Sequence, residues 1–105
     1  MRELPPTEVQ ALLAATTPPL LLDVREPWEL ETAAILGALN IPMGQVPTRL
    51  AELQPTRPIV VMCRSGRRSA QVGMLLERNG FTDVINLAGG IAAWSEDVDP
   101  SIPQY

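Results

Sequence analysis

The sequence predicts an α/β fold in which helices cover both faces of a parallel sheet. Three short apolar runs, at residues 20–24, 59–63 and 84–87, have the continuous hydrophobicity of strands that are buried on both faces. Segments with a helical spacing of apolar residues lie between them, and this alternation implies parallel strands joined by right-handed crossovers. With 105 residues the chain fits one domain, 1–105, that can bury a core without disulfides.

The first half of the chain is expected to contain two helices and two strands in alternation. Thr7–Ala15 has apolar residues at helical spacing behind Thr7, which is a candidate N-cap. The strand at Leu20–Val24 follows, and a short helix over Pro27–Glu31 begins with a proline, which the first turn of a helix tolerates. A shorter strand is expected at Asn40–Ile41.

The second half repeats the alternation, and its strands are the apolar runs at 59–63 and 84–87. Helical spacing predicts helices over Val46–Leu53, Ser69–Asn79 and Ile91–Val98. Two adjacent glycines, Gly89–Gly90, predict a tight turn before the last of these helices. The proline-rich tail, residues 99–105, is expected to lie irregularly on the surface.

The composition excludes several classes of function. The chain has one cysteine and no histidine, and its net charge is −4. One cysteine cannot form an internal disulfide, and without histidine a zinc site is not expected. The acidic charge argues against nucleic acid as a partner, and no apolar run approaches the roughly 18 residues of a membrane span. The N-terminus lacks a signal-peptide pattern, so we expect a soluble, cytoplasmic, monomeric protein without cofactor or metal.

The single cysteine, Cys63, is the last residue of a predicted central strand, and three arginines follow within five residues. A loop containing Gly66 leads from it to the helix expected near Ser69. Such a turn can point several backbone amides at one place, and the amides, the helix N-terminus and the arginines would each lower the thiol pKa. Packing alone is the other interpretation of a cysteine that ends an apolar strand. The glycine turn and the clustered arginines favour a reactive thiolate, which a donor must be able to reach.

The absence of histidine narrows the chemistry that such a thiolate can perform. A Cys–His hydrolase would have no base, and metal hydrolysis with histidine ligands is impossible. Sulfur transfer fits, because a thiolate can accept a sulfane sulfur, become a persulfide and pass the sulfur to a nucleophile without a strong general base.

Four sequence blocks together resemble the rhodanese family of sulfurtransferases, in the expected order and over nearly the whole chain. The segment "CRSGRRS" resembles the active-site loop, "LLDVREPWE" the first strand and turn, and "GFTDVINLAGGIAAW" the last strand and helix. The fourth block, "ILGALNIP", resembles a segment that is usually preceded by histidine, where this chain has Ala34. The resemblance implies a rhodanese-like α/β fold with a central five-stranded parallel sheet and helices on both faces.

The resemblance also implies roles for the residues of the loop. Cys63 would carry the persulfide, and an anionic donor such as thiosulfate would be attracted by arginines and cradled by loop amides. Cyanide, a thiol or a sulfur-carrier protein would be the acceptor. The residues implied in binding the donor are Arg64, Ser65, Gly66, Arg67, Arg68 and Ser69. The missing histidine is expected to affect packing or acceptor docking more than the chemistry.

Residues near the predicted loop have competing interpretations. Asp23 and Arg25 either orient the thiol loop or form a structural ion pair or turn cap, and the structural interpretation is favoured. Three acidic residues of the second helix are expected to form a solvated face, and the two tryptophans to be core or rim hydrophobes. These residues are Glu26, Glu29 and Glu31, and Trp28 and Trp94.

Three alternative functions remain open at the level of sequence. A phosphatase or arsenate reductase of related fold would have an arginine six residues after the cysteine, where this chain has Ser69. A module that only docks partners would usually lack the cysteine. The ending "EDVDPSIPQY" is similar to the ends of rhodanese domains attached to adenylyltransferases, which suggests sulfur delivery to a ubiquitin-like carrier in trans.

Overall fold

A parallel sheet of five strands forms the centre of the molecule, in the order β1-β5-β4-β2-β3. The computed structural model describes all residues from 1 to 105. Every neighbouring pair of strands is parallel, which confirms the predicted fold class. The strands are β1 (Arg2–Leu4), β2 (Leu20–Asp23), β3 (Leu39–Asn40), β4 (Ile59–Met62) and β5 (Val84–Leu87).

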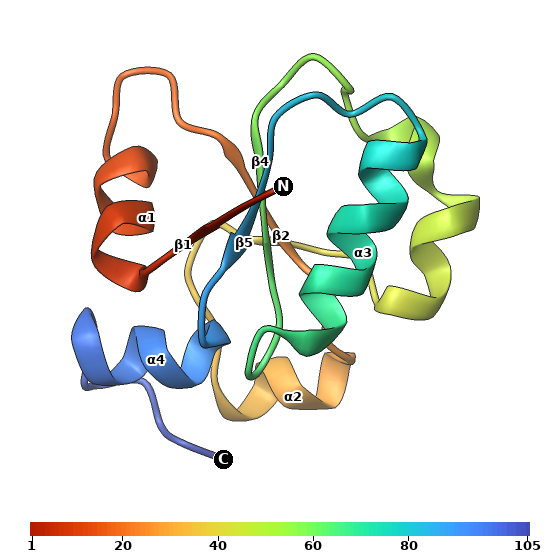
Figure 1. Cartoon of the computed structure of the whole chain (residues 1–105). Helices are drawn as coiled ribbons and strands as arrows, with labels where there is room; N and C mark the ends of the chain where they lie inside the picture. The colour runs from red at the N-terminus through yellow and green to blue at the C-terminus, as the bar shows by residue number, and fades with distance from the viewer.

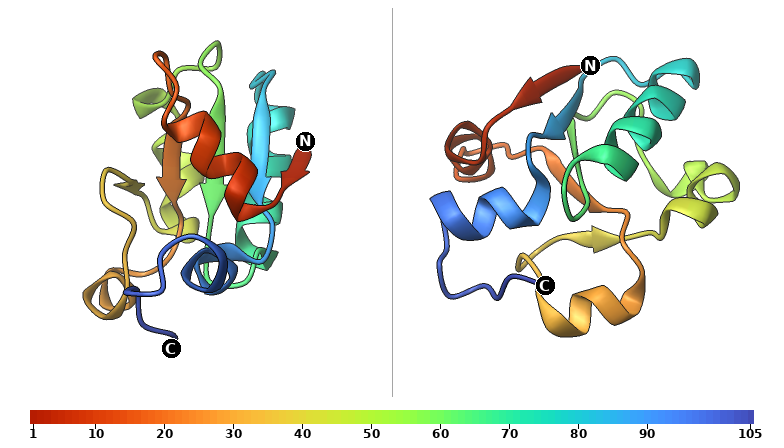
Figure 2. Two further views of the ribbon diagram at one scale, coloured as in Figure 1. Left: turned by 90° about the vertical axis from the view of Figure 1, so that its left-hand side faces the viewer. Right: turned by 60° about the horizontal axis from the view of Figure 1, so that its bottom comes forward.

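Helices cover both faces of the sheet (Figure 1). One face carries α1 and α4, and the other carries α3 and two 3₁₀ segments. The short helix α2 lies near the carboxyl ends of β2 and β4 (Figure 2). The helical elements are α1 (Pro6–Leu13), α2 (Pro27–Thr32), α3 (Arg67–Arg78), α4 (Gly90–Asp97), η1 (Met43–Thr48) and η2 (Leu50–Glu52). No helix has the length and apolar character that crossing a bilayer would require.

The central strand β4 divides its side chains between two separate cores. Val61 and Cys63 belong to a cluster of 12 buried residues on the face of α3 and η1. Val60 and Met62 belong to a cluster of 9 buried residues on the face of α1 and α4. Successive strand residues point to opposite faces, so this alternation places the cysteine on the side of α3.

Most predicted elements are confirmed, with two differences of substance. The strand β1 was missed because it is a mostly exposed edge of three residues, two of them charged, that only its pairing with β5 defines. The helix predicted over Val46–Leu53 is wrong: the segment folds as 3₁₀ turns. Pro47 has no amide hydrogen to give to an α-helical ladder, while Val46 and Leu53 are buried as their spacing suggested.

Two helix starts and the tail also differ in detail from the prediction. The helix α1 begins at Pro6, with Pro5 rather than Thr7 at the N-cap, and α3 begins two residues earlier than expected. The tail at 99–105 contains no helix or strand, as expected, but it is tied to α4. The Ser95 hydroxyl donates to the Ile102 carbonyl at 2.5 Å, and the Gln104 side chain donates to the Ala92 carbonyl at 2.9 Å.

Candidate active site

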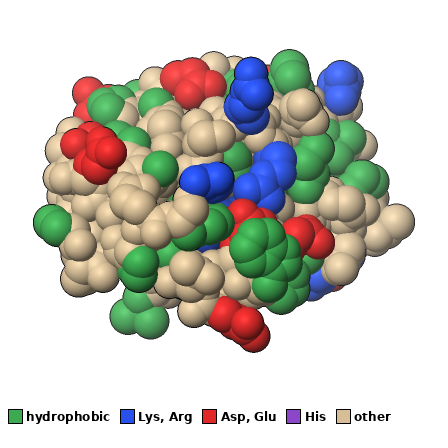
Figure 3. All heavy atoms as spheres, turned by 90° about the horizontal axis from the view of Figure 1, so that it is seen from below, with side chains coloured by type: hydrophobic (Ala, Val, Ile, Leu, Met, Phe, Trp, Pro, Cys, Tyr) green, Lys and Arg blue, Asp and Glu red, His purple; other side chains and the backbone are tan.

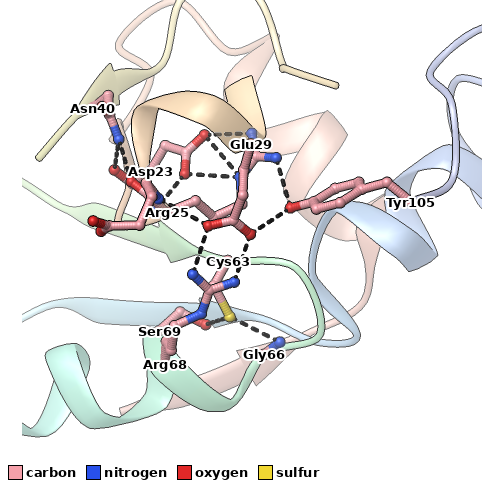
Figure 4. Close-up of polar contacts among 10 residues, drawn as sticks. Asp23, Arg25, Glu29, Asn40, Cys63, Gly66, Arg68, Ser69 and Tyr105 are labelled. Carbon is pink, nitrogen blue, oxygen red and sulfur yellow. Dashed lines mark hydrogen bonds and ion pairs between the residues drawn. The ribbon is translucent and has the colours of Figure 1, made fainter. Parts of the chain in front are cut away.

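The loop around Cys63 lies at the carboxyl end of β4 and leads directly into α3 (Figure 4). Gly66 is the N-cap of α3 with φ of 101°, a left-handed conformation that glycine adopts without strain. This turn points the Gly66 amide at the cysteine sulfur, with nitrogen and sulfur 3.1 Å apart. The Ser69 hydroxyl lies 3.3 Å from the same sulfur.

The first residues of α4 hold this loop from the other side. The amides of Ile91 and Ala92 donate to the carbonyls of Cys63 and Arg64, at 2.9 and 3.1 Å. The approach is so close that a Cβ on Gly90 would collide with the backbone of Cys63 and Arg64. The predicted tight turn is therefore present, and its second glycine is required by the thiol loop.

Asn86 of β5, which the sequence analysis did not single out, ties the loop to the sheet. Its amide nitrogen donates to the Gly66 carbonyl at 3.0 Å and to the Glu3 carboxylate at 2.9 Å. Its carbonyl oxygen accepts the Ser69 hydroxyl at 2.5 Å. A polar residue inside an apolar strand was the signal that could have revealed it, because a buried amide requires partners.

The Ser69 hydroxyl has one hydrogen and two neighbours that could accept it. While that hydrogen is donated to Asn86, the sulfur of Cys63 can bond to Ser69 only as a thiol that donates. A thiolate has no hydrogen to donate, so Ser69 must then turn its hydrogen toward the sulfur. The pair Ser69 and Asn86 can therefore accommodate both protonation states.

Opposing effects set the pKa of the Cys63 thiol, and the net result is a lowered pKa. Burial raises it, while hydrogen bonds from the Ser69 hydroxyl and from the backbone amides of Ser69, Gly66 and Ser65 lower it by more. The predicted lowering thus comes chiefly from hydrogen bonds to the sulfur. The arginine charges, which were expected to contribute, are not among the leading causes.

Cys63 is only 1% exposed, which differs from the expectation of a thiol that a donor can reach directly. The three cavities of the molecule are all lined by other residues. A donor can therefore meet the sulfur only when the groups that bury it move.

Arg68 forms an ion pair with an acidic residue, so its guanidinium is not free to bind a donor. Its two terminal nitrogens donate to the two carboxylate oxygens of Glu29, each at 2.8 Å. The expectation that Glu29 belongs to a solvated face is wrong, because the residue is 3% exposed, whereas Glu26 and Glu31 are exposed. Hydrogen bonds from Arg68 above all lower the pKa of Glu29 to about 2.

A capping box explains why Glu29 turns inward. The side chain of Glu29 accepts the amide of Glu26 at 2.9 Å, across the first turn of α2. The spacing of the two glutamates was the available signal for this contact. Arg68 in turn lies close enough to Cys63 for a charge on the sulfur to help raise the pKa of the guanidinium, although Glu29 is the larger cause.

The other two arginines of the loop keep their charges unpaired. The Arg64 guanidinium lies over the ring of Tyr105, with 5.0 Å between its carbon and the ring centroid. Arg67 is exposed, and neither it nor Arg64 takes part in an ion pair. From below, the carboxyl end of the sheet presents arginine side chains beside acidic and hydrophobic ones (Figure 3).

Asp23 and Arg25 form a buried ion pair with a bidentate contact. The shortest distance between them is 2.7 Å, and Asp23 also accepts the backbone amide of Arg25 at 3.0 Å, as a turn cap does. Asn40 fixes the same turn by donating to both backbone carbonyls at 2.9 Å. These contacts match the favoured structural interpretation. A side-chain connection toward the thiol loop runs through Tyr105, whose hydroxyl bonds to Arg25 and to Glu29 (Figure 4).

Comparison with known proteins places this geometry in a family. The model of the rhodanese-like domain matches residues 5–97. The chain belongs to the rhodanese-like family.

Relatives of this rhodanese-like chain include sulfurtransferases. It is 43% identical over 83 residues to a sulfurtransferase of Allochromatium vinosum, with 79% of this chain and 78% of that protein covered. It is 37% identical over 95 residues to an adenylyltransferase and sulfurtransferase of Zea mays, with 84% of this chain covered. The chain spans only 20% of the maize protein and 30% of a rhodanese-like protein of Arabidopsis thaliana.

Solved structures agree with the assignment. A human single-domain sulfurtransferase superposes with a TM-score of 0.82 at 26% identity, covering 92% of this chain and 97% of that one. These similarities support sulfur transfer as the general chemistry of the chain. No group of three or more His, Cys, Asp or Glu side chains is arranged to hold a metal ion. Ala34, where the sequence resemblance implied a histidine, is exposed.

Proposed function

We propose that this chain is a thiosulfate sulfurtransferase that works through a persulfide on Cys63. The hydrogen bond that the sulfur receives from the Gly66 amide is the observation that carries the proposal, because it favours a thiolate without any histidine, and the Ser69 hydroxyl at 3.3 Å can turn its hydrogen toward that thiolate. They would also stabilise the negative charge of a persulfide or of a bound donor.

The proposed reaction has two displacements at sulfur. The Cys63 thiolate attacks the sulfane sulfur of thiosulfate, the new S–S bond forms, and sulfite leaves with the electron pair of the broken S–S bond. Cyanide then attacks the outer sulfur of the persulfide, thiocyanate leaves, and the electron pair returns to Cys63 as a thiolate. No proton moves in either step with these anions, so the absence of a general base is no obstacle. A thiol could replace cyanide as the acceptor.

Access to the buried sulfur is a requirement of the proposed reaction. Because Cys63 is 1% exposed, the groups that bury it have to move when a donor enters. Arg64 and Arg67 keep unpaired charges that suit an anion, whereas Arg68 would first have to exchange Glu29 for the donor.

Delivery to a sulfur-carrier protein is the second candidate. The maize relative combines adenylyltransferase and sulfurtransferase in its name, and this chain matches it over 84% of its own length. In this version the persulfide sulfur goes to the C-terminus of a ubiquitin-like carrier that another protein activates. Failure of labelled persulfide sulfur to reach any such carrier would eliminate this version and leave the small-molecule reaction untouched.

Phosphatase or arsenate reductase activity is a weaker alternative. Ser69 stands where those enzymes need an arginine, and Arg68 is paired with Glu29 instead of facing an open phosphate site. Phosphate release from an aryl phosphate that depends on Cys63 would reverse this ranking. For the compartment and assembly state, we propose a monomer in the cytoplasm, with neither nucleic acid nor membrane as a partner.

Mass spectrometry of the intact protein tests the proposal directly. After exposure to thiosulfate, the mass should increase by one sulfur atom on Cys63, and cyanide should reverse the gain. Cys63→Ser is the matched control and should gain nothing. An unchanged mass in the wild-type protein, or an equal gain in Cys63→Ser, would contradict the proposed persulfide.

A further inference from the structure

The tail residue Tyr105 reaches the active-site loop from the far end of the sequence. Its ring lies under the Arg64 guanidinium at 5.0 Å and packs in a T-shaped arrangement with Trp28, with 6.4 Å between ring centroids. Its hydroxyl donates to Glu29 at 2.8 Å and accepts from Arg25 at 2.9 Å. One side chain therefore contacts a loop arginine through its ring. Through its hydroxyl it bonds to both buried ion pairs (Figure 4).

The ion pair of Arg68 and the ring contact of Arg64 differ in whether they neutralise the charge of the arginine. The bidentate pair with Glu29 offsets the positive charge of Arg68. A ring holds a guanidinium in a fixed orientation but supplies no negative charge, so Arg64 remains available to attract an anion. Arg64 directly follows Cys63 in the chain, which puts this oriented charge beside the thiol loop.

The ring itself is held by groups other than Arg64. The hydroxyl bonds to Arg25 in the loop between β2 and α2 and to Glu29 in α2. The tail is also held against α4 by the hydrogen bonds of Ser95 and Gln104. Arg64, in contrast, has an exposed side chain on a loop and no ion pair. The ring is thus the fixed member of the pair, and the guanidinium is the member that gains an orientation.

We infer that Tyr105 is a positioning residue for the anionic sulfur donor: its ring holds the guanidinium of Arg64, the residue that directly follows Cys63 in the loop. The inference rests on the proposed function in taking the donor to be a small anion. It assigns to the tail a part in donor selection, through the charge that it keeps in place rather than through any contact with the reacting atoms.

The test compares two alkylating reagents that differ in charge. Iodoacetate is an anion and iodoacetamide is neutral, and the Cys63 thiolate displaces iodide from either one to form a carbon–sulfur bond. Opening of the loop and ionisation of the thiol affect both rates, so the ratio of the iodoacetate rate to the iodoacetamide rate isolates the attraction of an anion. This ratio can be measured whether or not the protein transfers sulfur.

Tyr105→Leu should lower this ratio by about threefold or more, and Arg64→Ala by at least as much. Tyr105→Phe keeps the ring but loses the hydroxyl bonds to Arg25 and Glu29 that hold it, so its ratio should fall less than that of Tyr105→Leu. The double variant Arg64→Ala/Tyr105→Leu should fall no further than Arg64→Ala alone, since both changes remove one interaction. Arg57→Ala removes an exposed arginine at the opposite end of β4 and controls for net charge.

A wild-type ratio in Tyr105→Leu, or losses that add up in the double variant, would overturn the inference. Arg64→Lys provides a second test that leaves residue 105 intact, because lysine keeps the charge but stacks less well on a ring. Its ratio should lie between those of wild type and Arg64→Ala, and a wild-type value would also overturn the inference. Absence of a persulfide in the wild-type protein would instead refute the proposed function, and it leaves this ratio measurable.

Discussion

At the scale of single residues, the Ser69 hydroxyl is the group that adapts the site to an ionised sulfur. Replacing Ser69 with alanine removes the hydroxyl that lies 3.3 Å from the Cys63 sulfur and leaves the Asn86 carbonyl without its donor. The thiol pKa should rise, because one hydrogen bond that lowers it is lost. Alkylation by iodoacetamide at neutral pH should slow by roughly tenfold.

Ser65→Ala is the matched control for this change. Ser65 lies on the same loop with an exposed side chain, and its contribution to the thiol pKa comes from its backbone amide, which alanine retains. The control should therefore alkylate at the wild-type rate. Equal alkylation rates for Ser69→Ala and wild type would show that the Ser69 hydroxyl does not lower the thiol pKa.

Some residues of the site could be predicted from the sequence and others could not. Cys63 and its loop could be placed because residue type, glycine and arginines occur together in a short stretch. The buried roles of Asn86 and Glu29 left local signals, a polar residue in an apolar strand and a capping-box spacing. Tyr105 left none, since it lies 76 residues from Glu29 and only the path of the tail brings them together.

At the scale of elements, the loop depends on two glycines and on the first turn of α4. Gly66→Ala should destabilise the protein by roughly 1–2 kcal/mol, because alanine tolerates the left-handed region poorly. The new Cβ would make only ordinary contacts, 3.5 Å from the Gly89 nitrogen, so backbone strain is the main effect. Relief of that strain would turn the Gly66 amide away from the sulfur and slow alkylation of Cys63.

Gly80→Ala separates strain from chemistry. Gly80 also has a positive φ, 90°, and a Cβ there would meet nothing within 4 Å. Both variants should lose similar free energy of unfolding in urea, but only Gly66→Ala should lose thiol reactivity. Equal reactivity in the two variants would show that the direction of the Gly66 amide does not matter.

The elements that were mispredicted depend on information outside the local pattern. The edge strand β1 is defined by its pairing with β5, because it has only 3 residues and they are mostly exposed. Apolar spacing at Val46 and Leu53 correctly indicated burial, but spacing does not report the missing amide of Pro47, which decides between α and 3₁₀ geometry.

At the scale of the whole molecule, the Glu29–Arg68 pair joins α2 to α3 and, through Tyr105, to the tail. Because the folded-state pKa of Glu29 is lowered from 4.5 to about 2, the pair stabilises the protein above pH 4.5. This contribution is lost as the pH falls through 4.5 toward 2. Its size is of the order of 2 kcal/mol, after allowance for the partly exposed arginine.

Glu29→Gln should therefore be less stable than wild type at neutral pH, with a difference that shrinks as the pH approaches 2. Urea unfolding at a series of pH values measures it. Glu31→Gln removes an exposed carboxylate from the same helix and should follow the wild-type curve. A constant difference between Glu29→Gln and wild type across this pH range would contradict the assigned pairing.

The overall architecture was the most predictable level, because alternating strand and helix patterns leave few arrangements for a parallel sheet. The burial of the Cys63 thiol was the least predictable feature. Cys63 is 1% exposed because the loop, α3 and α4 close around it, and no local pattern reports that packing.

The central claim is that hydrogen bonds from the loop keep the Cys63 sulfur ionised. Ultraviolet titration of the thiolate measures this directly, because the chain contains one cysteine and Cys63→Ser provides the blank that removes the tyrosine signal. We expect a midpoint clearly below the ordinary value of a free cysteine, near ~8.5. A midpoint at or above that value would mean that burial outweighs the hydrogen bonds, and the account would be contradicted.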